Sequence, residues 1–186
     1  MKLLPVFKKT MMLIICLLMA SCASTDDPAL YAHEMPRLDL QRYFNGTLDA
    51  WGMFQDRSGK IVKRFTVVIQ CQWNGDVGTL DENFTYADGS KQKRIWTLTK
   101  VAPDHFTGKA GDVIGEAQGI VSGNTLHWKY VLALPVDDSV YHVDFDDVMV
   151  LMNGKVMLNR AIMRKFGVEL GSVTLSFARR SEQAGE

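Results

Sequence analysis

The chain has 186 residues, with 21 basic and 21 acidic side chains, and 47% of its residues are hydrophobic. This length suits a single domain with a proper core. The charges balance and form no basic block, which argues against a nucleic-acid-binding protein.

The N-terminal segment has the features of a secretory signal. Lys2, Lys8 and Lys9 precede an apolar run over residues 11–19, and small residues and Cys22 follow. This order predicts a signal peptide over residues 1–21, cleaved just before the thiol. The apolar run is shorter than the ~20 residues that cross a bilayer as a helix, so an uncleaved anchor is the weaker alternative.

Ala20, Ser21 and Cys22 resemble the lipobox of bacterial lipoproteins, with Met19 at a position where Leu is usual. The resemblance implies that Cys22 receives a diacylglyceryl group and, after cleavage, an N-acyl chain. Several acyl chains hold a protein durably, whereas one holds it only marginally. By resemblance to known sorting behaviour, Ala23 implies export to the outer membrane. We therefore expect a lipid-anchored protein on the periplasmic side of the outer membrane, with an ordinary signal peptide as the alternative.

Cys71 has no expected partner for an intramolecular disulfide. Of the chain's three cysteines, Cys16 leaves with the signal peptide and Cys22 is acylated. Cys71 alternates with Ile69 and Trp73, and a free cysteine in such a pattern packs as a small hydrophobic residue. We therefore expect a buried, unreactive thiol.

The remaining chain divides into a lipidated tether over 22–36, a β-barrel domain over 37–180 and a polar tail over 181–186. The tether is polar and contains proline. Residues 39–44 are expected to form a short turn or helix. Beyond them, apolar and polar residues alternate between turn signals such as Asn74-Gly75. The expected strands cover residues 44–55, 60–73, 77–86, 90–101, 105–110, 112–122, 125–134, 139–152, 155–158 and 168–178.

These segments predict an all-β fold. About ten strands joined by short turns are antiparallel neighbours, and closure into a barrel hides their edges. We expect an up-and-down, lipocalin-like (calycin-like) barrel, with an open sandwich as the alternative. Residues 159–166 have helical spacing, and Gly167 would end such a helix. We therefore expect a short helix before the last strand, with Phe166 buried.

One hairpin supports a curved wall. A two-residue turn at 123–124 places Gly119 opposite Trp128 and Gly115 opposite Leu132. Small residues then face large ones on the same side of the sheet, which leaves room for bulky side chains inside a closed barrel.

A second hairpin predicts charges inside the barrel. A three-residue loop at 87–89 places Glu82 opposite Arg94, on the apolar face that also holds Trp96. Two interpretations remain: a structural ion pair near the mouth, or a polar anchor for the head group of a ligand. Trp128 and Tyr130 are also expected inside, either as core or as ligand contacts. The candidate ligand-binding residues are Glu82, Arg94, Trp96, Trp128 and Tyr130.

The sequence gives weak support for a metal or a catalytic centre. His142, Asp144 and Asp146 share one face of a strand, but the other face is apolar, so we expect the acidic face in solvent and no metal. Asp146 and Asp147 interrupt the alternation, which predicts a bulge or a functional kink. No nucleophile elbow, phosphate loop or zinc-protease motif is present, and no cofactor is implied. An enzyme would have to use carboxylates such as Glu82 or Asp146 as general acid or base.

A family likeness is carried by several runs of residues, at 86–89, 94–96, 108–119, 123–124, 128–130, 145–149 and 159–167. With them the chain resembles an uncharacterised family of proteobacterial lipoproteins, catalogued as domain of unknown function 3833. Val148 stands where Trp is expected. The resemblance implies no established activity, so no catalytic residue carries over. Members are often encoded near enzymes that modify membrane fatty acids, which favours a lipid.

We therefore expect an outer-membrane-anchored periplasmic lipoprotein whose barrel binds a lipid or another apolar small molecule. The alternatives are a non-enzymatic envelope partner or assembly protein that acts through its surface, and an enzyme that acts on a lipid through carboxylates. The enzyme is the less favoured of these. The expected partners are the membrane, through acyl chains on Cys22, and the ligand; nothing indicates nucleic acid or identifies a protein partner.

Overall fold

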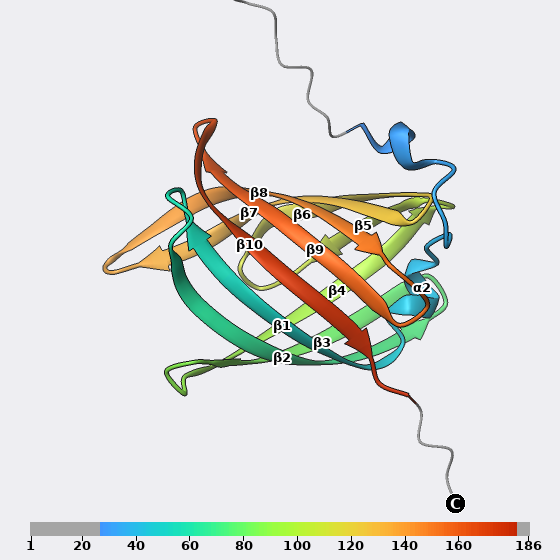
Figure 1. Ribbon diagram of the computed structural model, residues 1–186, viewed down its shortest axis with the longest axis horizontal. Helices are drawn as coiled ribbons and strands as arrows, with labels where there is room; N and C mark the ends of the chain where they lie inside the picture. The colour runs from blue at the N-terminus through green and yellow to red at the C-terminus, as the bar shows by residue number, and fades with distance from the viewer. Residues whose placement is uncertain (1–26, 182–186) are drawn as a thin grey trace, which may run out of the picture.

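A computed structural model describes residues 27–181, in which ten antiparallel strands form a closed barrel (Figure 1). Each strand pairs with the next along the chain, and β1 pairs with β10. The expected up-and-down, lipocalin-like barrel is confirmed. The signal peptide, Cys22 and residues 182–186 lie outside the described residues. The strands are β1 Gly46–Asp56, β2 Ile61–Asn74, β3 Val77–Tyr86, β4 Lys91–Ala102, β5 His105–Lys109, β6 Val113–Ser122, β7 Thr125–Val136, β8 Ser139–Leu151, β9 Val156–Lys165 and β10 Val168–Arg179.

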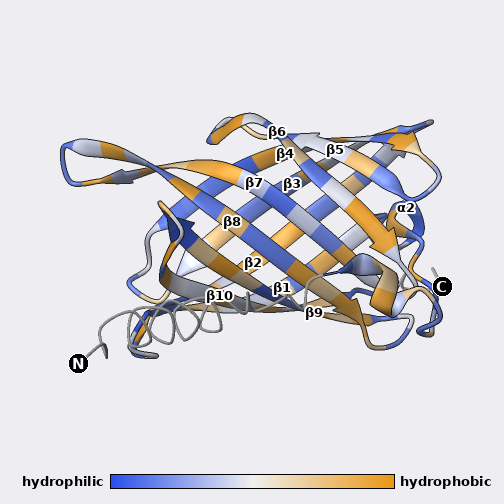
Figure 2. Ribbon diagram, turned by 90° about the horizontal axis from the view of Figure 1, so that it is seen from above, coloured by the Kyte–Doolittle hydropathy of each residue, from blue (hydrophilic) through white to orange (hydrophobic). Residues whose placement is uncertain are grey.

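Alternation and tight turns explain these strands. Figure 2 shows hydrophobic and hydrophilic residues alternating along them, because successive side chains point to opposite faces. In β2, Val67, Ile69 and Cys71 are buried inside the barrel, as expected for the thiol. At the β3–β4 turn Gly89 has a φ of 84°, which glycine adopts without strain. The Tyr86 amide donates to the carbonyl of Ser90, so the predicted hairpin is confirmed.

One end of the barrel is closed by the chain before β1. The short helix α2, Leu40–Tyr43, begins where the Asp39 carboxylate accepts a hydrogen bond from the Arg42 amide (3.0 Å). The next residue, Phe44, is buried, and its carbonyl accepts a hydrogen bond from the Trp73 indole (2.7 Å). The turn or helix expected over 39–44 is thus confirmed. No helix within residues 27–181 is long and apolar enough to span a membrane.

Residues 27–36, which fall in the expected tether, also lie against this closed end. The 3₁₀ helix η1, Pro28–Tyr31, contacts β6 and β7. The Tyr31 ring centroid is 5.6 Å from that of His127. Gly123, in the β6–β7 turn, allows the close approach, since a Cβ there would overlap the carbonyl oxygen of Tyr31. Packing on the barrel therefore begins before residue 37, where the domain was expected to start.

The predicted helix over 159–166 is wrong. These residues belong to β9 and its turn, and β9 pairs along its length with β8 and β10. Phe166 and Gly167 form a two-residue turn with φ values of 52° and 78°, and Phe166 is 91% exposed. The apolar residues of this segment fit both helical and strand spacing, and two neighbouring strand edges favour the strand because they satisfy its backbone hydrogen bonds.

The register of the β6–β7 hairpin is partly as predicted. Gly119 lies opposite Trp128, but Leu132 lies opposite Val113 instead of Gly115. The register shifts between Ile114 and Gln118, where Gly115 has a φ of 70°. This irregularity places extra residues on β6, which a prediction from turn length and alternation cannot count.

Candidate functional site

The barrel encloses a cavity of about 870 Å³ that reaches from the closed end to the opposite end. Leu40 and Phe44 line its floor, and Val136 and Val140 of the β7–β8 hairpin line its mouth. Among the described residues, the mouth is bordered only by the turns β1–β2, β3–β4, β5–β6, β7–β8 and β9–β10. The shape is therefore a cup with one entrance.

Apolar and aromatic side chains make up most of the wall. The Trp96 ring centroid lies 5.7 Å from that of Trp128 and 5.5 Å from that of Tyr130, edge to face in both cases. Tyr130 also stacks on Phe145 at 4.9 Å. Trp96 and Trp128 are buried, whereas Tyr130 is half-buried. All three predicted aromatic residues line the cavity, and they also pack on one another as part of the core.

Glycines on β5 and β6 make room for the indole of Trp128. A Cβ at Gly108 would lie 2.5 Å from Cζ2 of Trp128, and one at Gly119 would overlap the same ring. The indole therefore lies flat over β5 and β6, and the cavity stays open beside it. This is the small-to-large packing that the sequence predicted for Gly119.

Glu82 and Arg94 lie opposite each other in register and both line the cavity, as predicted. Their predicted ion pair is wrong. Arg94 instead donates from Nε (3.0 Å) and Nη2 (2.6 Å) to Oδ2 of Asp112, in the β5–β6 turn. Within residues 27–181, Glu82 has neither a hydrogen bond nor an ion pair through its side chain. The side chain of Arg94 extends toward the mouth, where Asp112 is the nearer acid.

Asp147 is an inward carboxyl that sequence reasoning missed. The register of β8 with β7 and β9 is continuous, so the bulge predicted at Asp146 and Asp147 is wrong. Asp147 keeps the inward direction of Val143 and Phe145, and this spacing of two was the available signal. It is 5% exposed and accepts a hydrogen bond from Nδ2 of Asn159 (3.4 Å).

Asp146 points outward and does not line the cavity. Its Oδ2 atom lies 3.4 Å from Nζ of Lys129 and 3.6 Å from Nη1 of Arg164. His142 and Asp144 are exposed on the same outer face. Within the described residues no group of three or more His, Cys, Asp and Glu side chains could hold a metal ion. Asp146 therefore cannot act as an acid or base inside the barrel, whereas Glu82 can.

Burial raises the pKa of Glu82 and of Asp147, two of the carboxyls that line the cavity. The pKa of Glu82 rises to about 7 because of burial, an effect that the charge of Arg94 partly offsets and the charge of Asp112 reinforces. The pKa of Asp147 also rises to about 7, mainly because of burial. The charges of Asp146 and Glu82 raise it further, and the hydrogen bond from Asn159 partly offsets the rise. The pKa of Tyr130 lies well above its ordinary value, mainly through burial. Each carboxyl therefore changes charge near neutral pH.

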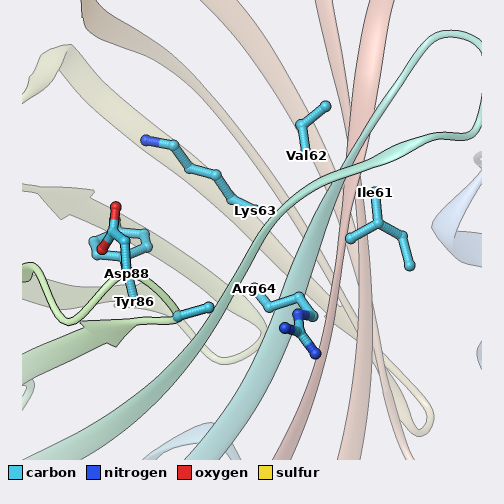
Figure 3. A pocket seen from close by; sticks show the side chains of 7 residues that line it. Ile61, Val62, Lys63, Arg64, Tyr86 and Asp88 are labelled. Carbon is cyan, nitrogen blue, oxygen red and sulfur yellow. The ribbon is translucent and has the colours of Figure 1, made fainter.

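A second depression, of about 250 Å³, lies between β2 and the β3–β4 turn (Figure 3). Ile61, Val62 and Arg64 point in different directions there. The Lys63 ammonium lies 5.3 Å from the centroid of the Tyr86 ring. The depression has less than a third of the volume of the barrel cavity, so the barrel interior is the candidate site.

The family model "Protein of unknown function (DUF3833)" matches residues 16–179. The chain belongs to this family. The resemblance to domain of unknown function 3833 is thus confirmed, and the family's description names no activity. A search of curated proteins found no match.

Among solved structures, similar barrels occur in other proteins. An S-type phycobiliprotein lyase from Guillardia theta is 6% identical, with a TM-score of 0.56, over 76% of this chain and 90% of that one. A protein with unknown function from the DUF3598 family of Nostoc punctiforme is 13% identical, with a TM-score of 0.54, over 80% of this chain and 51% of that one. At these identities the DUF3833 chain shares their fold alone.

Proposed function

We propose that this DUF3833 protein binds an elongated apolar ligand, such as a lipid, inside its barrel. The cavity carries the proposal. Its volume of about 870 Å³ falls within the range of roughly 300–1,000 Å³ that small-molecule sites occupy, and its wall is apolar with a few polar groups. One end is closed by α2, so a ligand would enter through the mouth.

An empty interior of this size would be costly. At ~24 cal/mol per Å³, a dry void of about 870 Å³ would cost about 20 kcal/mol, more than the ~5–15 kcal/mol by which domains are stable. Water would have to fill it against a wall that includes Phe65, Trp96 and Leu132. An apolar ligand is the occupant that such a wall stabilises most, because it removes apolar surface from water.

We further propose that acyl chains on Cys22 anchor the protein in the outer membrane, on the periplasmic side. The first described residues lie at the closed end, where η1 packs on β6 and β7. At ~3.5 Å per residue, the five residues from Cys22 to Asp27 can span at most about 18 Å. An anchor at Cys22 would therefore keep the closed end near the membrane and the mouth away from it.

Extraction of the purified protein tests the ligand. Native mass spectrometry should show a bound mass that organic solvent removes, and the extract should contain a lipid or similar apolar compound. A cavity filled only by water, with no binding of added apolar probes, would refute the proposal. Labelling with a radioactive fatty acid tests the anchor, and a Cys22→Ala variant that retains the label would refute it.

A second candidate function, as an envelope partner that acts through its surface, is favoured by one observation. Apolar side chains at the turns around the mouth are exposed, including Phe166 at 91%, Val140 at 63% and Val168 at 57%. Exposed apolar patches of this kind mark interaction sites. An extract without ligand, together with a protein captured by this rim, would favour this candidate over the first.

A further inference from the structure

The charged groups in the cavity wall are unequal in number. Three carboxyls line the cavity, on Glu82, Asp112 and Asp147, against the guanidinium of Arg94 and the ammonium of Lys63 at the mouth. Asp112 already pairs with Arg94, through two hydrogen bonds to a single oxygen. No cation pairs with Glu82 or Asp147 within residues 27–181. The interior therefore holds two carboxyls without a cation of their own.

The buried polar atoms without partners in this wall are all oxygens. They are Oδ1 of Asp112, Oδ1 of Asp147 and Oδ1 of Asn159, among the described residues. Asp147 and Asn159 are 5% and 4% exposed, so these oxygens have left bulk water. A buried acceptor without a donor is costly, and this cost disappears when a ligand supplies the donor. These three buried oxygens are therefore acceptors that a donor on a ligand would satisfy.

Glu82 and Asp147 lie on opposite sides of the barrel. In the closed order β3 and β8 are five strands apart out of ten, and the charge of Glu82 acts on Asp147 across the cavity. The half-buried ring of Tyr130 and the buried ring of Trp96 lie on the strands between them. A cation near aromatic rings gains further stabilisation from their π faces.

We propose that the cavity takes an amphiphile whose polar end is a cationic hydrogen-bond donor, such as an ammonium group, held between Glu82 and Asp147. This inference rests on the proposed binding of an apolar ligand, and it names the head-group chemistry of that ligand. An anionic head group would find the guanidinium of Arg94 already paired with Asp112 and would meet two further carboxyls.

The site predicts how binding depends on pH. Glu82 faces Arg94, Asp112, Tyr130 and the neutral thiol of Cys71. Asp147 faces Asn159, Tyr130, Arg94 and Glu82, with Asp146 behind it on the outer face. Both carboxyls have a pKa of about 7, so each carboxylate that the cation requires tightens its binding roughly thirtyfold from about pH 5.5 to about pH 8.5. An anionic ligand would weaken over the same range.

Three amphiphiles with the same chain test the proposal: dodecylamine, dodecanol and dodecanoate, each displacing the neutral dye N-phenylnaphthylamine from the purified protein without detergent. Dodecylamine should bind tightest at about pH 8.5, and its dissociation constant should fall by at least about thirtyfold from about pH 5.5, while dodecanol changes little. Glu82→Gln and Asp147→Asn should each remove at least part of this pH dependence and leave dodecanol binding intact. Asp144→Asn, on the outer face of the same strand, should change nothing.

Each other outcome has a definite meaning. Equal binding of all three amphiphiles, or tighter binding of dodecanoate, would overturn the cationic head group while the apolar site remains. Unchanged pH dependence in both carboxyl variants would overturn the roles of Glu82 and Asp147. If neither the dye nor dodecanol binds, the proposed function itself fails, and the inference fails with it.

Discussion

Replacement of Glu82 by Gln should stabilise the protein at alkaline pH. The pKa of Glu82 rises from an ordinary 4.5 to about 7 in the folded state, mainly because of burial. A carboxyl whose pKa is raised in this way does not destabilise the folded state below pH 4.5, where it is protonated in both the folded and the unfolded protein. As the pH rises from 4.5 through about 7, the folded state loses stability. At ~1.4 kcal/mol per pKa unit, the full cost above pH 7 is about 3 kcal/mol. Gln has nearly the same shape and carries no charge.

Urea unfolding of the two proteins at two pH values measures this effect. At about pH 5 the free energies of unfolding should differ by less than ~1 kcal/mol, and at about pH 8.5 the variant should be more stable by about 3 kcal/mol. Glu116→Gln is the control, since Glu116 is exposed on the outer face and its ion pair with Lys109 contributes little. The Glu82→Gln variant should also retain ligand less well than the wild-type protein. A difference that is equal at both pH values would show that cavity water solvates Glu82 fully, which would refute the reasoning.

Three further outcomes are expected. Leu175→Trp adds bulk to the cavity wall and should lower the amount of co-purifying ligand, whereas Ile95→Trp, on the exposed outer face, should not; equal ligand content would contradict the location of the site. Trp73→Phe removes the 2.7 Å hydrogen bond to the Phe44 carbonyl and should lower the free energy of unfolding by about 1–2 kcal/mol in urea. Burial raises the pKa of the Cys71 thiol to about 12, so Ellman's reagent should modify it at about pH 8 only after unfolding, and rapid modification of the folded protein would count against this.

Short-range patterns in the sequence were enough for much of the site. Alternation assigned the inward face of each strand, and the turn at 87–89 then placed Glu82 opposite Arg94. These two features act within one hairpin, so they need no knowledge of the remaining chain. The same reasoning placed Trp96 inside and Gly119 opposite Trp128. Spacing alone would also have found Asp147, since it shares the direction of the buried residues before it.

Where the local sequence fitted two kinds of secondary structure equally well, contacts with neighbouring strands decided which one formed. Residues 159–166 fit a helix and a strand alike, and they became part of β9 because β8 and β10 offered hydrogen bonds on both edges. Likewise, the irregularity at Gly115 depends on how β6 meets β7 and cannot be counted from turn length. Propensity over so few residues is a weak preference that pairing overrides.

By itself, the sequence determined most of the strands and hairpins, the inward direction of Glu82 and Arg94, and the membership of a family, because each depends on residues close together in the chain. Only the tertiary structure decided that Arg94 pairs with Asp112, that Glu82 and Asp147 lie across one cavity, and that α2 closes it. These features join residues far apart in the chain, and their geometry depends on how the barrel closes. The chemistry of the interior follows from that closure, since burial is what moves both carboxyls toward neutral pH.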